Sequence, residues 1–221
     1  MNWSYDEKNS PYDDQAIARL TTCARDIRQS FARKGDKTWQ VLARSFSEFL
    51  RMSTLVPNEA IRLRDYMMYE NFRWHRARLP RGTKVIVWTA AVHSIKQRSS
   101  ANAQSVVLPL GSYVHQALGA KSAVVGFCAL QGRYSLINRA NTALISVQPD
   151  SLEAQAFADY DASMRYLDTK HLRQLGIVQA NALSYAKADT EQWSELMDGM
   201  IVLREEHPVN VVHSRQPQQS E

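Results

Sequence analysis

The sequence has few of the features that identify a membrane protein or a small disulfide-bonded protein. Its 221 residues include only two cysteines, Cys23 and Cys128, which is typical of free thiols in a reducing compartment. It has no apolar run of about 18 residues, the length that a membrane-spanning helix needs. The opening residues, 1–14, are polar and mixed in charge, unlike a signal peptide. We therefore expect a cytoplasmic protein with no membrane contact.

The common catalytic and metal-binding motifs are also missing. There is no glycine-rich phosphate loop, no Gly-x-Ser-x-Gly turn, no His-Glu-x-x-His and no paired Cys-x-x-Cys. Glu205, Glu206, His207 and His213 carry metal-binding groups, but their spacing fits no known ligand pattern. The sequence indicates no basic residue beside Cys128, and a thiol nucleophile needs one. We therefore predict no metal and no cofactor.

The charge is strongly positive but lacks a recognisable nucleic-acid-binding module. The formal net charge is +5 and the pI is about 9.3. Basic residues gather between positions 62 and 81, where the arginines are Arg62, Arg64, Arg73, Arg76, Arg78 and Arg81. Without a module signature, this run is typical of a solvated helix surface. Nucleic-acid binding stays a third and weaker alternative.

Hydrophobic periodicity divides the chain into a helical part and an alternating part. Residues 11–80 show apolar stripes at three- and four-residue steps, broken at 34–37, and a third helix is predicted at 58–79 with Asn58 as its N-cap. Buried strands are predicted at 84–89, 122–128 and 199–204, all in one sheet, with a weaker strand at 142–147. Further helices are predicted at 110–119, 151–167 and 189–197.

This order of elements predicts an α/β fold: a mixed, largely parallel sheet with flanking helices, preceded by a helical segment. We expect a polar segment at 1–10 and a disordered tail at 213–221. Between them, one partial domain covers 11–212, helical over 11–80 and α/β over 81–212.

Four residues of the third predicted helix are candidates for a functional site. Arg64, Asp65, Met68 and Asn71 lie within two turns, and burying a guanidinium, a carboxylate and an amide is costly unless they bond to each other or to a ligand. Their hydrogen bonds either hold the helix against the following strand, or these side chains line a ligand-binding site.

The same residues carry a family resemblance. The pattern Arg-Asp-x-x-Met-x-x-Asn-x-x-Trp starts at Arg64, and a strand ending in Trp-x-x-x-x-His follows at Trp88 and His93. This combination resembles the erythromycin esterase family over roughly residues 10–212. The resemblance implies hydrolysis of a small-molecule ester or lactone by a histidine-activated water. It makes His93 the catalytic candidate, and Arg64, Asp65, Met68 and Asn71 the substrate-binding candidates.

Two departures from the family pattern shape the prediction. Ala91 stands where many relatives have an amide, and residues 1–80 do not resemble the family's amino-terminal segment, which carries the water-activating base. We therefore predict an incomplete or split carboxyl-terminal half that is inactive alone and works with a partner chain or the missing amino-terminal half. The alternative is a non-catalytic binding or assembly module that pairs with another chain through an open sheet edge.

Overall fold

The computed structural model describes residues 13–97, 108–134 and 143–208. The chain forms two compact units, Met1–Val124 and Val125–Glu221. The segments expected at 1–10 and 213–221 lie outside the described residues. None of the described helices is both long enough and apolar enough to cross a membrane.

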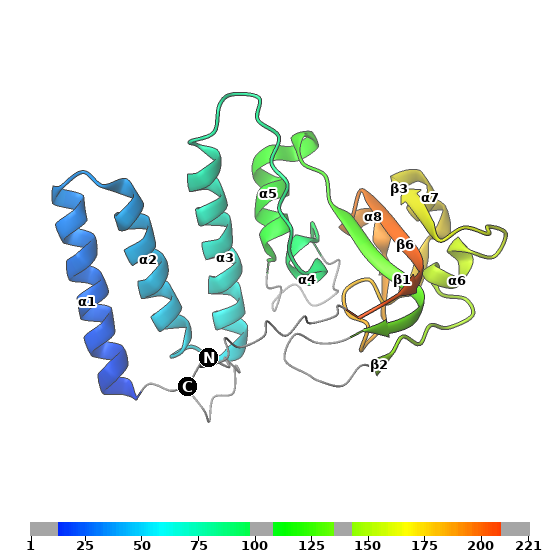
Figure 1. Ribbon diagram of the computed structural model, residues 1–221, viewed down its shortest axis with the longest axis horizontal. Coiled ribbons are helices and arrows are strands. Elements are labelled where there is room, and N and C mark those ends of the chain that lie inside the picture. Colours follow the sequence, from blue (N-terminus) through cyan, green and yellow to red (C-terminus); the bar gives the residue numbers. More distant parts are fainter. Residues whose placement is uncertain (1–12, 98–107, 135–142, 209–221) are drawn as a thin grey trace, which may run out of the picture. The chain divides into compact units, whose positions relative to one another are not determined.

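The first unit begins with three helices that follow one another side by side (Figure 1). They are α1 (Asp14–Arg33), α2 (Lys37–Met52) and α3 (Pro57–Arg76). Asp13 and Asp36 cap the first two helices, because their carboxylates accept hydrogen bonds from backbone N–H groups of the first turn. The helix α3 starts differently from the predicted Asn58 cap: Val56 is its N-cap, and Pro57 is in the first turn, where its missing N–H costs nothing.

Residues 83–90, which include the predicted strand at 84–89, form neither a helix nor a strand. That prediction is wrong, and so is its placement in the sheet with the other two strands. Ile86 is 89% exposed and Trp88 is 82% exposed. A valine- and isoleucine-rich run favours an extended backbone, but a strand also needs a neighbouring strand to accept and donate its hydrogen bonds. No strand pairs with residues 83–90 in the described part of the chain.

Short helices complete the first unit. A single turn, α4 (Ala91–Ser94), is followed by α5 (Leu110–Leu118) and the 3₁₀ turn η3 (Gly119–Lys121), so the predicted helix at 110–119 is confirmed. The ring of Tyr113 on α5 stacks on Tyr69 and meets the edge of Tyr66, which joins α5 to α3. Gly111 faces the backbone of Ser94, where a Cβ atom would overlap the carbonyl oxygen. This glycine therefore lets α5 lie directly against α4.

The second unit contains a mixed four-stranded sheet in the order β2-β1-β6-β3. Its strands are β1 (Val125–Tyr134), β2 (Ala143–Leu144), β3 (Met164–Asp168) and β6 (Gly199–Glu206). The strands β1 and β6 are parallel, with Val125 opposite Gly199, whereas β2 and β3 run antiparallel to their neighbours. The predicted α/β class, a mixed sheet with flanking helices, is confirmed, but the sheet is not largely parallel, because only β1 and β6 run parallel among its described strands. The strands predicted at 122–128 and 199–204 are confirmed as β1, which begins at Val125, and β6.

Three short helices flank this sheet (Figure 1): α6 (Leu152–Ala156), α7 (Thr169–Leu175) and α8 (Trp193–Leu196). A separate antiparallel pair consists of β4 (Ile177–Ala180) and β5 (Asp189–Gln192). Trp193 is fully buried, and its indole N–H donates to the carbonyl of Val178 at 2.8 Å. This bond ties α8 to β4.

Two helix predictions in the second unit are wrong in extent. The helix predicted at 151–167 covers α6 and the separate strand β3, and the helix predicted at 189–197 covers strand β5 and then α8. In the first case the residues before Met164 form turns and bends, and Arg204 fixes them by donating to the carbonyls of Tyr160 and Ala162. Such long-range contacts override local helix propensity.

Candidate active site

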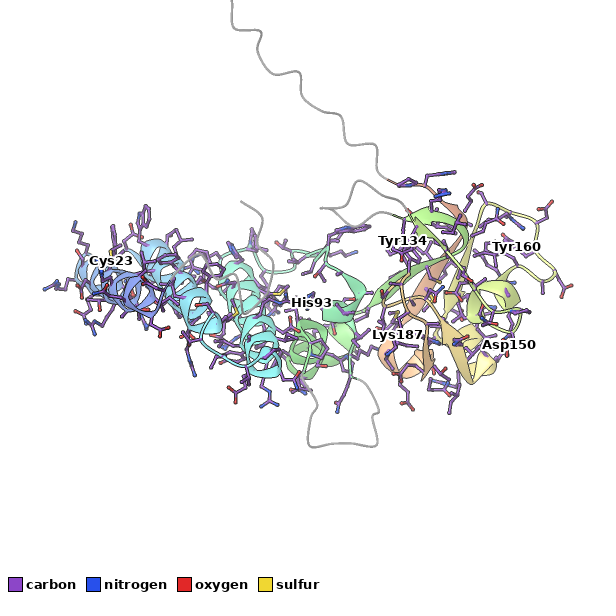
Figure 2. The ribbon with its side chains drawn as sticks, turned by 90° about the horizontal axis from the view of Figure 1, so that it is seen from below. Cys23, His93, Tyr134, Asp150, Tyr160 and Lys187 are labelled. Carbon is purple, nitrogen blue, oxygen red and sulfur yellow. The ribbon has the colours of Figure 1, made fainter. Side chains whose placement is uncertain are left out.

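The candidate site combines a pair of neighbouring residues on α3 with a histidine on α4. Arg64 and Asp65 are consecutive on α3, and His93 is in the single turn α4 (Figure 2). The Nδ1 atom of His93 is 2.7 Å from Oδ1 of Asp65, and its Nε2 atom is 2.7 Å from Nη2 of Arg64. The imidazole therefore lies between a carboxylate and a guanidinium.

The chemistry of the two neighbours assigns the proton on His93. A guanidinium has only donors, so Nε2 of the imidazole must accept and carries the lone pair. In the neutral ring the proton is then on Nδ1, which faces the carboxylate of Asp65. Although the two atoms are in ion-pair contact, they are not aligned for a hydrogen bond. A carboxylate on Nδ1 and an accepting Nε2 is the arrangement of a histidine that can take a proton.

This cluster is shielded from water. The side chain of Asp65 is 3% exposed and that of His93 is 15% exposed. Charged groups at such positions interact more strongly than they would in water, because the local dielectric is lower. The packing of α5 on α4 at Gly111, next to Ser94, holds the turn that carries His93.

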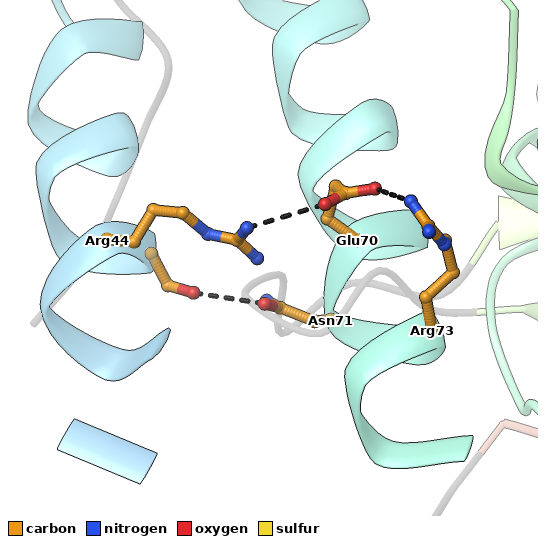
Figure 3. A network of polar contacts seen from close by, with 5 residues as sticks. Arg44, Glu70, Asn71 and Arg73 are labelled. Atoms are coloured by element: carbon orange, nitrogen blue, oxygen red, sulfur yellow. Dashed lines mark hydrogen bonds and ion pairs between the residues drawn. The ribbon is translucent and has the colours of Figure 1, made fainter. Parts of the chain in front are cut away.

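The other two predicted substrate-binding residues lie apart from this contact. Asn71 accepts a hydrogen bond from the Ser45 hydroxyl on α2 at 3.1 Å (Figure 3), so it joins α2 to α3. Met68 is half-buried on α3, one turn after Arg64. The structure therefore brings Arg64, Asp65 and His93 together and leaves Asn71 in a helix–helix contact.

Sequence reasoning missed a second buried polar cluster, in the second unit. Glu153 on α6 is fully buried, and its Oε1 accepts the backbone N–H of Asn181 at 2.6 Å. Burial raises the pKa of the Glu153 carboxyl. Burial, together with the neighbouring Glu153, raises the pKa of the Cys128 thiol well above its usual value, so Cys128 is a poor nucleophile. Among the described residues, no group of three His, Cys, Asp or Glu side chains could hold a metal ion.

The comparisons with known proteins decide the family. The erythromycin esterase family model matches residues 3–206. The chain belongs to the erythromycin esterase family. No curated protein matches it by sequence.

Three solved structures share the fold of this erythromycin esterase family member. A succinoglycan biosynthesis protein has a TM-score of 0.70 and 15% identity, over 91% of this chain and 52% of that one. A Bacillus cereus protein has a TM-score of 0.66 and 16% identity, over 95% and 55%. A mutant of the erythromycin esterase EreC in its open conformation has a TM-score of 0.58 and 13% identity, over 86% and 52%. The chain thus spans about half the length of each of these proteins.

Proposed function

We propose that this chain supplies part of an ester- or lactone-hydrolysing site in which His93 activates a water molecule. The observation that carries the proposal is the contact of one imidazole with both Asp65 and Arg64, at 2.7 Å on each side. Membership of the erythromycin esterase family supports the reaction class. Substrate binding by Arg64, Asp65, Met68 and Asn71 is part of the same proposal.

The proposed reaction uses each of the three side chains differently. Asp65 lies beside Nδ1 and stabilises the positive charge of the imidazolium, so Nε2 of His93 can take a proton from water as the water oxygen attacks the ester carbonyl carbon. Arg64 leaves Nε2 and donates to the oxyanion that forms. The bond to the leaving alcohol then breaks, and the alcohol oxygen takes the proton from Nε2. The products are a carboxylic acid and an alcohol.

We further propose that the site is completed by a second polypeptide segment. The chain spans 52–55% of the length of the solved proteins that share its fold. Residues 85–88 expose two valines, an isoleucine and a tryptophan. An exposed apolar run of this kind is typical of a surface that another segment covers.

The test is an activity assay of the chain alone and with a supplied second half. The half of each of the three solved relatives that this chain does not match would be added as a separate chain, and hydrolysis of p-nitrophenyl esters and a macrolide lactone followed. We expect turnover only in a mixture, with a loss of about 10²–10⁴-fold on His93→Ala, the usual contribution of one acid/base group.

His171→Ala is the matched control. His171 on α7 also has its Nδ1 atom 2.7 Å from an aspartate, Asp168 at the end of β3, but both side chains are half-exposed. Removing the His171 imidazole should leave turnover unchanged. Equal losses in the two variants would contradict a specific role for His93, and turnover by the lone chain would contradict the need for a second half.

A non-catalytic binding or assembly module is the second candidate. The exposed apolar residues 85–88 favour it, because they belong to no helix or strand in the described part of the chain, and a strand of another chain could pair with their backbone. Mixtures that bind tightly but show no His93-dependent hydrolysis would establish this function instead.

A further inference from the structure

A basic concavity lies at the end of α3, within the first unit. Its volume is about 710 Å³, which is in the range of small-molecule binding sites. Its charged lining comes from α2, from the last turns of α3 and from the turn that follows, and consists of Arg44, Glu70, Arg73, Arg76, Arg78 and Arg81. Five arginines and one glutamate give the lining four net positive charges.

Only part of this charge is neutralised by ion pairs. Glu70 uses both carboxylate oxygens: Oε2 is 3.4 Å from Arg44 and Oε1 is 2.7 Å from Arg73 (Figure 3). Arg78 donates to the carbonyl of Trp74 at 2.8 Å and stacks on its ring at 3.5 Å from the centroid. Arg76 and Arg81 form no salt bridge within the described residues.

The helix terminus alone does not account for so much positive charge. The carboxyl end of a helix carries roughly half a negative charge, which one or two basic residues offset. Arg73 and Arg76 are in the last turn of α3 and serve that purpose. Arg44 comes from α2, while Arg78 and Arg81 follow the helix. These three arginines converge on the concavity from outside the last turn.

We propose that this concavity binds a small anion with two or more phosphate groups. Guanidinium groups donate two parallel hydrogen bonds to phosphate oxygens, so several arginines around one concavity favour a multiply charged oxyanion. The volume fits a molecule of nucleotide size or smaller. Glu70 holds Arg44 and Arg73 in position through its two ion pairs, and it opposes the anion by its own charge.

Calorimetric titration of the full chain with inorganic pyrophosphate tests the proposal. We expect saturable binding that weakens as sodium chloride is added. The double variant Arg76→Gln/Arg81→Gln should weaken binding by about tenfold or more, because each lost guanidinium is a charged donor. The variant Glu70→Gln should bind pyrophosphate more tightly than the wild type, since it removes the opposing charge.

Arg19→Gln/Arg28→Gln is the matched control. Both arginines are exposed on α1 and do not line the concavity, and the variant has the same net charge as the double variant above. It should bind pyrophosphate within about twofold of the wild type, as expected for distant surface charges screened by salt. An equal loss in both double variants would overturn the proposal in favour of a net-charge effect. Tight binding of an oligonucleotide without binding of pyrophosphate would overturn it in favour of nucleic acid.

Discussion

Glu153 is a carboxyl group enclosed by the second unit, and its ionisation is linked to folding. Burial is the main cause that raises its pKa above the ordinary value of 4.5. A carboxyl with a raised pKa stabilises the fold while it is protonated. That contribution is complete below 4.5 and is lost as the pH rises through the pKa of the folded protein.

We predict that Glu153→Gln changes how stability depends on pH. The amide keeps an oxygen that can accept from the N–H of Asn181, but it cannot ionise. The free energy of unfolding of the wild type should therefore fall relative to that of the variant as the pH rises above 4.5. Urea unfolding of both proteins between pH 4 and pH 8 measures this. A constant difference across that range would contradict the prediction.

The sequence predicts only part of the residue set around His93. Arg64, Asp65 and Asn71 all suit a buried polar network, and helical spacing places them on neighbouring sides of one helix. Asn71 is seven residues after Arg64, about 10 Å further along the helix axis. At that height it meets Ser45 on α2. Residue spacing predicts which side chains share one face of a helix. It does not predict which neighbouring element packs against each turn of that face.

At the scale of elements, the helices with a continuous apolar stripe are predicted well, whereas one of the three predicted buried strands does not form. The stripes of 11–80 correspond to α1, α2 and α3, and the predicted break at 34–37 separates α1 from α2, although the predicted Asn58 cap of α3 is wrong. The run at 84–89 resembles a buried strand, yet it forms no strand. Strand formation depends on a partner distant in sequence, which local composition does not reveal.

Gly111 gives a prediction at this scale, because it sets the distance between α4 and α5. A Gly-to-Ala change inside a helix normally stabilises a protein by about 0.5–1 kcal/mol. Here the added Cβ would overlap the backbone carbonyl of Ser94. We therefore expect Gly111→Ala to lower the free energy of unfolding by about 1–3 kcal/mol, as overpacking does. Chemical denaturation measures the free energy of unfolding of both proteins. A variant that is more stable than the wild type would contradict the packing of α5 on α4.

At the scale of the whole molecule, the two units bury apolar side chains unequally. The second unit fully buries Leu152, Leu172, Trp193 and Met200. In the described part of the first unit, Leu50 is the one large apolar side chain that is buried to the same degree. Trp39, Leu42, Phe46 and residues 85–88 are exposed instead. The exposed apolar side chains of the first unit support the proposal that a second segment covers it.

The last prediction tests whether residues 85–88 form the covered surface. Ile86→Lys places a charge on a side chain that is 89% exposed, so the free energy of unfolding of the chain alone should change by less than about 0.5 kcal/mol. Burying an isoleucine side chain contributes about 1.5–3 kcal/mol. The variant should therefore bind the unmatched half of a solved relative about 10- to 100-fold more weakly than the wild type does.

Ile177→Lys is the control for this change, because Ile177 is also an exposed isoleucine, at 74%, but lies on β4 in the second unit. Thermal unfolding of each chain with increasing amounts of the added half measures binding, since a ligand of the native state raises the midpoint temperature by mass action. Wild type and Ile177→Lys should show the same rise, and Ile86→Lys a smaller one. If the midpoint temperature rises equally for all three chains, residues 85–88 are not where the second segment binds. The apolar face of α2 around Trp39 and Phe46 then becomes the surface to test, by replacing these residues with lysine.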